Sequence, residues 1–176
     1  MTGSQQVNPR WQRAIHEAGH AVAALVTGIS ILCLSLERGI STRGLRIDSS
    51  CWIDYQSMEG KFRPDDVCKR KMTVAYAGAV AQALFFDECP IEVFCEQKDD
   101  QENVRKCVDD LRGLRVSESH VWKCRKEAWE EAICLVEERR SVIYAIAQAA
   151  NQKQTLKGPE IEDIARSVDP TTFQNG

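Results

Sequence analysis

The sequence predicts a mainly α-helical domain with one small β-sheet, an α+β fold. Apolar residues with helical spacing fill most of the 176-residue chain, and one short strand-rich stretch follows the first of these helical segments. No internal repeat, low-complexity tract or proline-rich linker divides the chain. We therefore expect one domain over residues 11–168, with flexible ends at residues 1–10 and 169–176.

The first predicted element is a helix over residues 9–27. Pro9 suits the first helical turn, and Asn8 before it can cap that turn. Gly28 then ends the helix. These signals fix both helix ends from local chemistry alone.

The strand-rich stretch follows directly. A strand is expected at residues 31–36, and its predicted partners are residues 45–47 and 51–55. Gly39 and Gly44 lie in the segment between, which predicts a loop or a hairpin.

The rest of the chain predicts helices. The first of them begins at residues 63–66. Three more are expected at residues 99 or 100 to 112, at 118–150 with a kink, and at 158–168. In the first of these, small residues leave room for another helix to approach closely: Ala75, Gly78 and Ala79. The longest carries an apolar stripe expected to pack in the core: Trp122, Trp129, Ile133, Val136, Ile143, Ile146 and Ala150.

Composition excludes several classes of protein. The net charge is −3 and no basic block occurs, which argues against a nucleic-acid binder. No apolar stretch approaches the ~20 residues that span a bilayer, and the polar first ten residues do not resemble a signal peptide. We expect a soluble, cytoplasmic protein whose eight cysteines, none in a C-x-x-C pair, are mostly structural thiols.

One motif carries recognisable chemistry: His16-Glu17-Ala18-Gly19-His20. Residues four apart lie on one face of a helix, so both imidazoles can reach one metal ion, and neutral imidazole suits Zn²⁺. Glu17 points beside the metal, where its carboxylate can take a proton from an activated water. The motif predicts zinc-dependent attack on a peptide carbonyl.

A five-residue pattern such as His-Glu-x-x-His can also occur by chance, and the two histidines would then be ordinary helix residues. Against this, two of the three histidines in the chain lie in the motif, and apolar residues flank it on both sides. Gly19 costs ~1 kcal/mol in a helix interior relative to alanine, which indicates a need for close backbone approach.

Residues 15–22 resemble the zinc-site helix of the peptidase domain of the FtsH family, which are AAA+ zinc metalloproteases. Residues 73–85 are similar to that family's small-residue helix, and residues 153–161 to its closing pattern. Asp99-Asp100, at the head of a helix, resembles the place where the family takes its third zinc ligand, an aspartate. The resemblance implies a zincin peptidase fold and a zinc metalloendopeptidase holding one Zn²⁺ per chain.

The chain also departs from the family. It has neither the ATPase module nor the transmembrane helices, and Leu45-Arg46 follow Gly39–Gly44 where a phosphate loop needs Lys-Ser or Lys-Thr. Without an unfoldase, the enzyme would cut flexible or unfolded segments of protein substrates, or borrow an unfoldase ATPase in trans. Residues 50–63 differ from the family's glycine-rich loop, and the oligomeric state is left open.

Helix geometry favours Asp100 over Asp99 as the third ligand. From Asp100, the positions four, seven, eight and eleven residues on are all apolar: Val104, Cys107, Val108 and Leu111. From Asp99, the positions four, seven and eleven residues on are polar: Asn103, Lys106 and Asp110. Asp99 should therefore face water as a cap or dipole partner. A buried aspartate without a partner is expensive, so Asp100 calls for a cation.

The leading hypothesis is thus a zinc endopeptidase with His16, His20 and Asp100 as metal ligands. Glu17 would be its general base, and an extended substrate would bind at the exposed edge of the strand at residues 31–36. One alternative is a catalytically silent adaptor or regulator that still binds metal. Another is a structural zinc site closed by a fourth ligand, for which His120 is the spare histidine.

Overall fold

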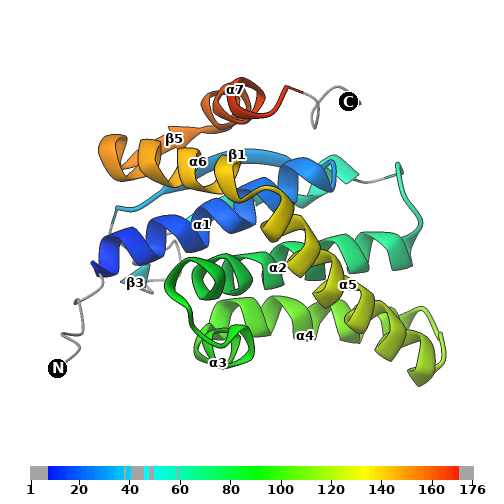
Figure 1. Ribbon diagram of the computed structural model, residues 1–176. Coiled ribbons are helices and arrows are strands. Elements are labelled where there is room, and N and C mark those ends of the chain that lie inside the picture. Colours follow the sequence, from blue (N-terminus) through cyan, green and yellow to red (C-terminus); the bar gives the residue numbers. More distant parts are fainter. Residues whose placement is uncertain (1–7, 38, 41–45, 48–49, 59, 171–176) are drawn as a thin grey trace, which may run out of the picture.

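The computed structural model describes residues 8–37, 39–40, 46–47, 50–58 and 60–170. They form a mainly helical structure with a three-stranded antiparallel sheet and a separate two-stranded one, which confirms the predicted α+β class (Figure 1). No helix among these residues has the length and apolarity to cross a membrane.

The helices begin and end close to the predicted positions in most cases. They are α1 (Pro9–Val26), α2 (Pro64–Phe86), α3 (Pro90–Glu96), α4 (Lys98–Gly113), α5 (Glu118–Glu138), α6 (Arg140–Lys153) and α7 (Gly158–Val168), with a 3-10 turn at Tyr55–Met58. The strands are β1 (Ser30–Ser35), β2 (Gly39–Ile40), β3 (Arg46–Ile47), β4 (Ser50–Asp54) and β5 (Thr155–Lys157).

Helix α1 lies at the centre of the fold. It packs against α2 on one side and against α6 and β1 on the other, while α2 in turn packs against α3, α4 and α5 (Figure 1). Small residues allow the central contact: a Cβ on Gly19 would lie 2.6 Å from the carbonyl oxygen of Ala77. Both predicted ends of α1 are confirmed. The Asn8 side chain accepts a hydrogen bond from the amide of Arg10, and Gly28, just after the helix, has a φ of 74°.

The sheet has the strand order β4-β1-β5, so β1 is its central strand. Two predictions were wrong. Residues 31–36 offer no open edge over the paired part of β1, because β5 pairs with it at Ser35↔Thr155 through Cys33↔Lys157. Residues 46–47 pair with Gly39–Ile40 in a separate two-stranded sheet instead of joining β1.

The single kinked helix expected over residues 118–150 is two separate helices, α5 and α6, which break at Arg139. The apolar stripe is also shorter than expected, because Trp122 is 67% exposed whereas Trp129 packs against Tyr76 and Phe94. Helix α3, seven residues long, was not predicted.

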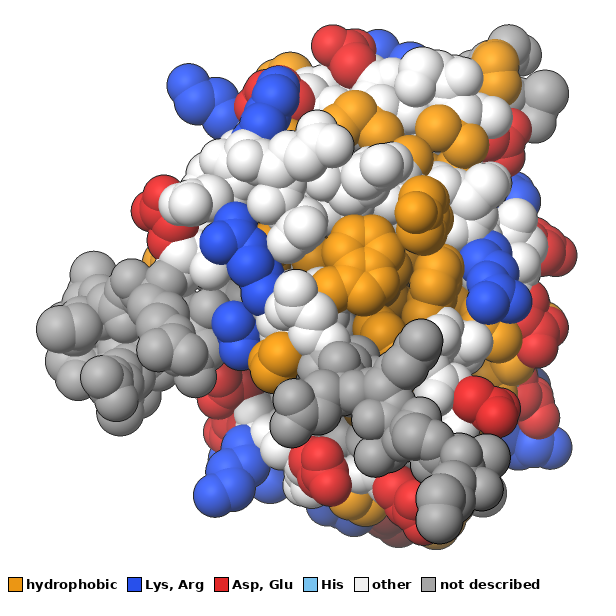
Figure 2. Space-filling model, turned by 60° about the vertical axis from the view of Figure 1, so that its left-hand side comes forward, with side chains coloured by type: hydrophobic (Ala, Val, Ile, Leu, Met, Phe, Trp, Pro, Cys, Tyr) orange, Lys and Arg blue, Asp and Glu red, His pale blue; other side chains and the backbone are white. Residues whose placement is uncertain are grey.

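Part of the apolar surface stays open to solvent. On the face shown in Figure 2, hydrophobic side chains gather at the centre and charged ones surround them. Aromatic rings also pack together where α1, α2 and α6 meet, with ring centroids 5.5 Å apart for Trp11 and Tyr144 and 6.5 Å for Phe85 and Tyr144.

Candidate metal centre

Helix α1 carries the histidine motif on its buried side. His16, Glu17 and His20 are each less than 9% exposed, and the two imidazole rings lie one turn apart with centroids 4.7 Å from each other. Their Nε2 atoms are 3.0 Å apart. The helix therefore presents both nitrogens toward one point, as the four-residue spacing predicts.

Helix α4 supplies the third group. Asp100 lies in its first turn, 8% exposed, with Oδ2 3.2 Å from His16 Nε2 and Oδ1 3.4 Å from His20 Nε2. Asp99 is exposed, so the orientations inferred from helical spacing for both aspartates are confirmed. Residue 98 begins the helix one position before the predicted start.

The three side chains lie near the spacing of ligands around a tetrahedral zinc ion, with a different oxygen of Asp100 facing each imidazole. Ligand atoms ~2.0–2.2 Å from such an ion lie about 3.3–3.5 Å from each other, close to the 3.0–3.4 Å that separates these atoms. Although Asp100 Oδ2 is buried, it accepts no well-formed hydrogen bond. An orphaned buried carboxylate oxygen beside two imidazole nitrogens fits a cation.

A backbone contact from α2 orients one ligand. His20 Nδ1 lies 2.7 Å from the carbonyl oxygen of Val74. A carbonyl oxygen only accepts, so Nδ1 carries the proton and donates it. In the neutral ring, Nε2 is then left with its lone pair facing His16 and Asp100, which is the tautomer that metal binding needs.

Gly78 on α2 forms the wall behind the histidines. A Cβ at this position would collide with His20 Nε2 and lie 2.8 Å from His16 Nε2. Sequence reasoning assigned Gly78 to helix packing and missed this role. A glycine in the middle of a helix, where it is unfavourable, was the signal that could have indicated it.

The charges of the centre are coupled. Burial alone would lower the pKa of His20, but the carboxylate of Asp100, with smaller contributions from Glu17 and the Val74 carbonyl, raises it to about 9. Burial would raise the pKa of Asp100, but the two histidines hold it well below its usual range. The site thus attracts positive charge, and without a metal a proton on His20 supplies it.

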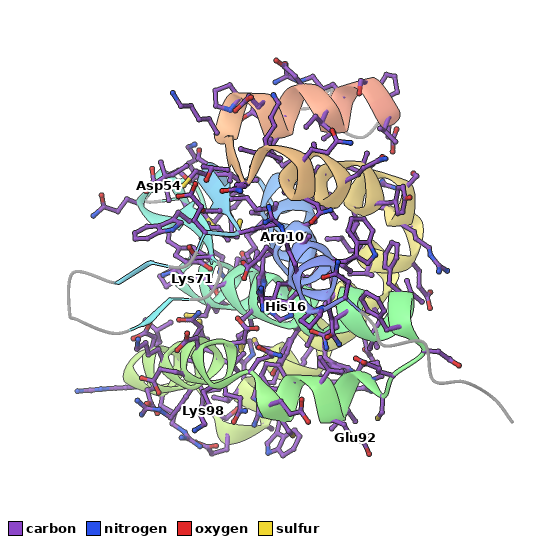
Figure 3. The ribbon with its side chains drawn as sticks, turned by 90° about the vertical axis from the view of Figure 1, so that its left-hand side faces the viewer. Arg10, His16, Asp54, Lys71, Glu92 and Lys98 are labelled. Atoms are coloured by element: carbon purple, nitrogen blue, oxygen red, sulfur yellow. The ribbon has the colours of Figure 1, made fainter. Side chains whose placement is uncertain are left out.

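The centre opens into a cavity of about 640 Å³. Figure 3 looks at this side of the molecule, with His16 near the middle and Lys98 on the helix below it. Besides the motif, the lining includes Ser50 and Cys51 of β4 and Arg13 and Gln82, none of which the sequence singled out. Burial, followed by the charge of Glu17, raises the pKa of the Cys51 thiol well above its usual value.

His120 lies elsewhere. Its Nε2 is 3.5 Å from Asp65 Oδ2, at the start of α5. In the part of the chain that the structure describes, the group that could share one ion comprises His16, His20 and Asp100 and no fourth ligand. This arrangement does not support His120 as the ligand that closes a structural zinc site, because His120 is not among the residues that converge there.

Scans of the chain against models of protein families and against curated proteins found no match. Its function is therefore inferred from the geometry of the centre itself.

Proposed function

We propose that this protein is a zinc-dependent endopeptidase of the FtsH-like type. The observation that carries the proposal is the convergence of His16, His20 and Asp100 at tetrahedral spacing, with Glu17 as the residue directly after the first ligand. These three would hold the ion. Bound zinc would supply Lewis-acid polarisation of the scissile carbonyl and would lower the pKa of water.

Glu17 would act as the proton carrier of the reaction. It is buried and lines the same cavity as the ligands, so it can reach a water that enters from the open side. Its carboxylate takes the proton from the attacking water and later gives it to the leaving amine. A site that only braced the fold would have no use for this carboxylate.

The substrate would lie along β4 rather than β1. Strand β4 is an edge of the three-stranded sheet, and Ser50 and Cys51 at its start line the cavity of the metal centre. An extended peptide can add to such an edge through main-chain hydrogen bonds. This mode requires flexible or unfolded segments, unless an unfoldase partner supplies them in trans.

Proline substitutions test this edge. Alternate residues of a strand direct their amides to opposite sides. One of Cys51→Pro and Trp52→Pro therefore removes an amide that faces the open edge of β4, and the other removes an amide that donates to β1. We expect one variant to raise KM on an unfolded substrate while keeping its stability. If neither raises KM, the peptide does not bind at β4.

The function itself is tested by metal content and cleavage of casein. The purified protein should hold about one zinc per chain, and Glu17→Gln should retain the zinc but lose at least ~100-fold in cleavage rate. Glu96→Gln is the matched control, because Glu96 lines the same cavity but is exposed and is not a ligand. If neither wild type nor control cleaves casein although zinc is bound, an adaptor or regulatory role is favoured instead.

A further inference from the structure

A second surface of the molecule carries exposed aromatic groups. Seven residues line a cavity of about 340 Å³, which we call the α3–α5 groove: Tyr76, Ile91, Phe94, Trp122, Arg125, Lys126 and Trp129. None of them belongs to the metal centre.

The floor of the groove is a closed aromatic cluster. Tyr76 packs edge-on against both Phe94 and Trp129, with ring centroids 5.0 Å apart in each case. The rim, by contrast, is uncovered, since Trp122 is 67% and Ile91 62% exposed. Large apolar side chains left open around a hollow are typical of protein interaction sites.

Arg125 distinguishes this groove from an ordinary apolar hollow. Its guanidinium lies 5.4 Å from the centre of the Trp122 ring, and its Nε is buried without a hydrogen-bond partner. The neighbouring Lys123 and Lys126 pair with Glu127 and Glu130 at 3.8 and 3.6 Å, whereas Arg125 has no ion-pair partner among the described residues. A half-buried cation without an anion favours binding of a carboxylate.

The positive charge continues beyond the groove. Phe94 and Arg125 also line an adjoining cavity of about 520 Å³. Its lining carries four basic side chains against the single acidic Glu102: Lys98, Arg105, Arg112 and Arg125. Arg105 and Arg112 are already paired with neighbouring carboxylates, so Lys98 and Arg125 are the cations of this lining that have no ion-pair partner within the described part of the chain. This excess of positive charge stands out on a protein with a net charge of −3.

We propose that the α3–α5 groove docks an acidic segment of a partner protein that presents a bulky apolar side chain beside its carboxylates. The apolar side chain would fill the space between Trp122 and Trp129, and a carboxylate would pair with Arg125. Tryptophan, tyrosine and arginine are the residues that dominate binding energy at protein interfaces, and all three line this groove. The proposal does not depend on the proposed peptidase activity.

The test uses a fluorescein-labelled peptide, Gly-Ser-Asp-Glu-Phe-Asp-Glu-Leu-Gly-Ser, and fluorescence anisotropy. All proteins carry Glu17→Gln, so that cleavage cannot consume the peptide. Trp122→Ala should weaken binding about 10- to 30-fold, as expected for an interface anchor. Because Trp122 is exposed, this variant should fold. Tyr144→Ala, which removes a 48% exposed aromatic from α6, is the matched control and should bind like its parent.

The charge contribution is tested with a second peptide in which Asn and Gln replace Asp and Glu. The parent protein should prefer the acidic peptide about 10-fold, and Arg125→Gln should remove that preference. Equal affinities of the Trp122→Ala and Tyr144→Ala proteins would overturn the proposal, as would no binding by the parent at about 1 mM peptide. A dimer in sedimentation velocity that Trp122→Ala dissociates would assign the groove to self-association instead.

Discussion

Among the residues that the structure describes, two histidine–aspartate clusters can be compared, and one of them resembles a metal site. In the first, His16, His20 and Asp100 each direct a different atom toward a common point. In the second, Asp65 Oδ2 and Cys124 Sγ both approach the same nitrogen, Nε2 of His120, at 3.5 Å. One ring nitrogen can serve only one partner at a time.

Burial separates the two clusters further. The side chains of His16 and Asp100 are 10% and 11% exposed, whereas that of His120 is 37% exposed. Water can solvate His120 directly, while the groups of the first cluster must compensate one another's charge. Residue types alone therefore do not make a metal site. Convergence and desolvation do.

The strongest test of this difference removes the carboxylate from each cluster. Asp100→Asn should weaken zinc binding by more than about 100-fold, because it replaces a charged ligand in the buried cluster. Asp99→Asn and Asp65→Asn should leave zinc affinity unchanged. Isothermal titration with zinc measures all three, and loss of zinc in Asp99→Asn would reverse the assignment of the third ligand.

The metal-free protein should reveal the coupling of the buried cluster through pH. The pKa of His20 is raised to about 9 in the folded state, above 6.5 when unfolded. The resulting stabilisation of roughly 3 kcal/mol is complete below pH 6.5 and is lost as the pH rises through 9. Asp100, whose pKa is lowered, contributes its full stabilisation above its unfolded pKa of ~4 and loses it progressively as the pH falls below that value.

Urea unfolding in EDTA between pH 5 and pH 9.5 measures this loss. In Asp100→Asn the cause of the raised His20 pKa is gone, so the slope above pH 6.5 should be much smaller. An equal slope in both proteins would mean that other groups titrate.

Gly78→Ala tests the wall behind the buried histidines. The added methyl collides with both imidazoles, so we expect a loss of about 1–3 kcal/mol in stability and at least a tenfold loss in zinc affinity. Gly113→Ala is the control, because a Cβ there meets nothing within 4 Å. Unchanged zinc affinity in Gly78→Ala would show that the imidazoles can shift without cost.

The smallest effect is expected at the second cluster. His120→Ala should change stability by less than about 1 kcal/mol, since its contacts are partly exposed and its ring is solvated. Zinc content by mass spectrometry should be unaffected. A lower zinc content would make His120 part of a metal site after all.

The sequence predicted the residues of the metal centre better than it predicted how the surrounding helices and strands pack. A four-residue spacing on a helix determines that His16 and His20 share a face, and the apolar positions after Asp100 determine which aspartate turns inward. Both are local properties of a helix. Which elements pack against α1 and α4 depends on residues far away in the sequence. For this reason Gly78 was assigned only to helix packing.

The errors have the same cause. The break at Arg139 has no glycine or proline to mark it, and α5 ends there with an ordinary backbone bond from the Arg139 amide to the Leu135 carbonyl. Trp122 shares a helix face with Trp129 and was therefore expected in the core. Helical spacing cannot show that the neighbouring helices end before they cover Trp122. Strand β5 has three residues, too few for a periodic signal, and its partner is 120 residues away.

That pairing of β1 with β5 affects how the protein is made. Ser35 and Thr155 contact each other across 120 residues, which a ribosome translating about 5–20 residues per second needs about 6 to 24 s to add. The two histidines and Asp100 emerge before the last strand, so the metal ligands are available while β1 still has an unpaired side. An unpaired strand of this kind is prone to join other chains. The nascent chain therefore depends on residues 155–157 to cover this side of β1, well after the metal-centre residues have been made.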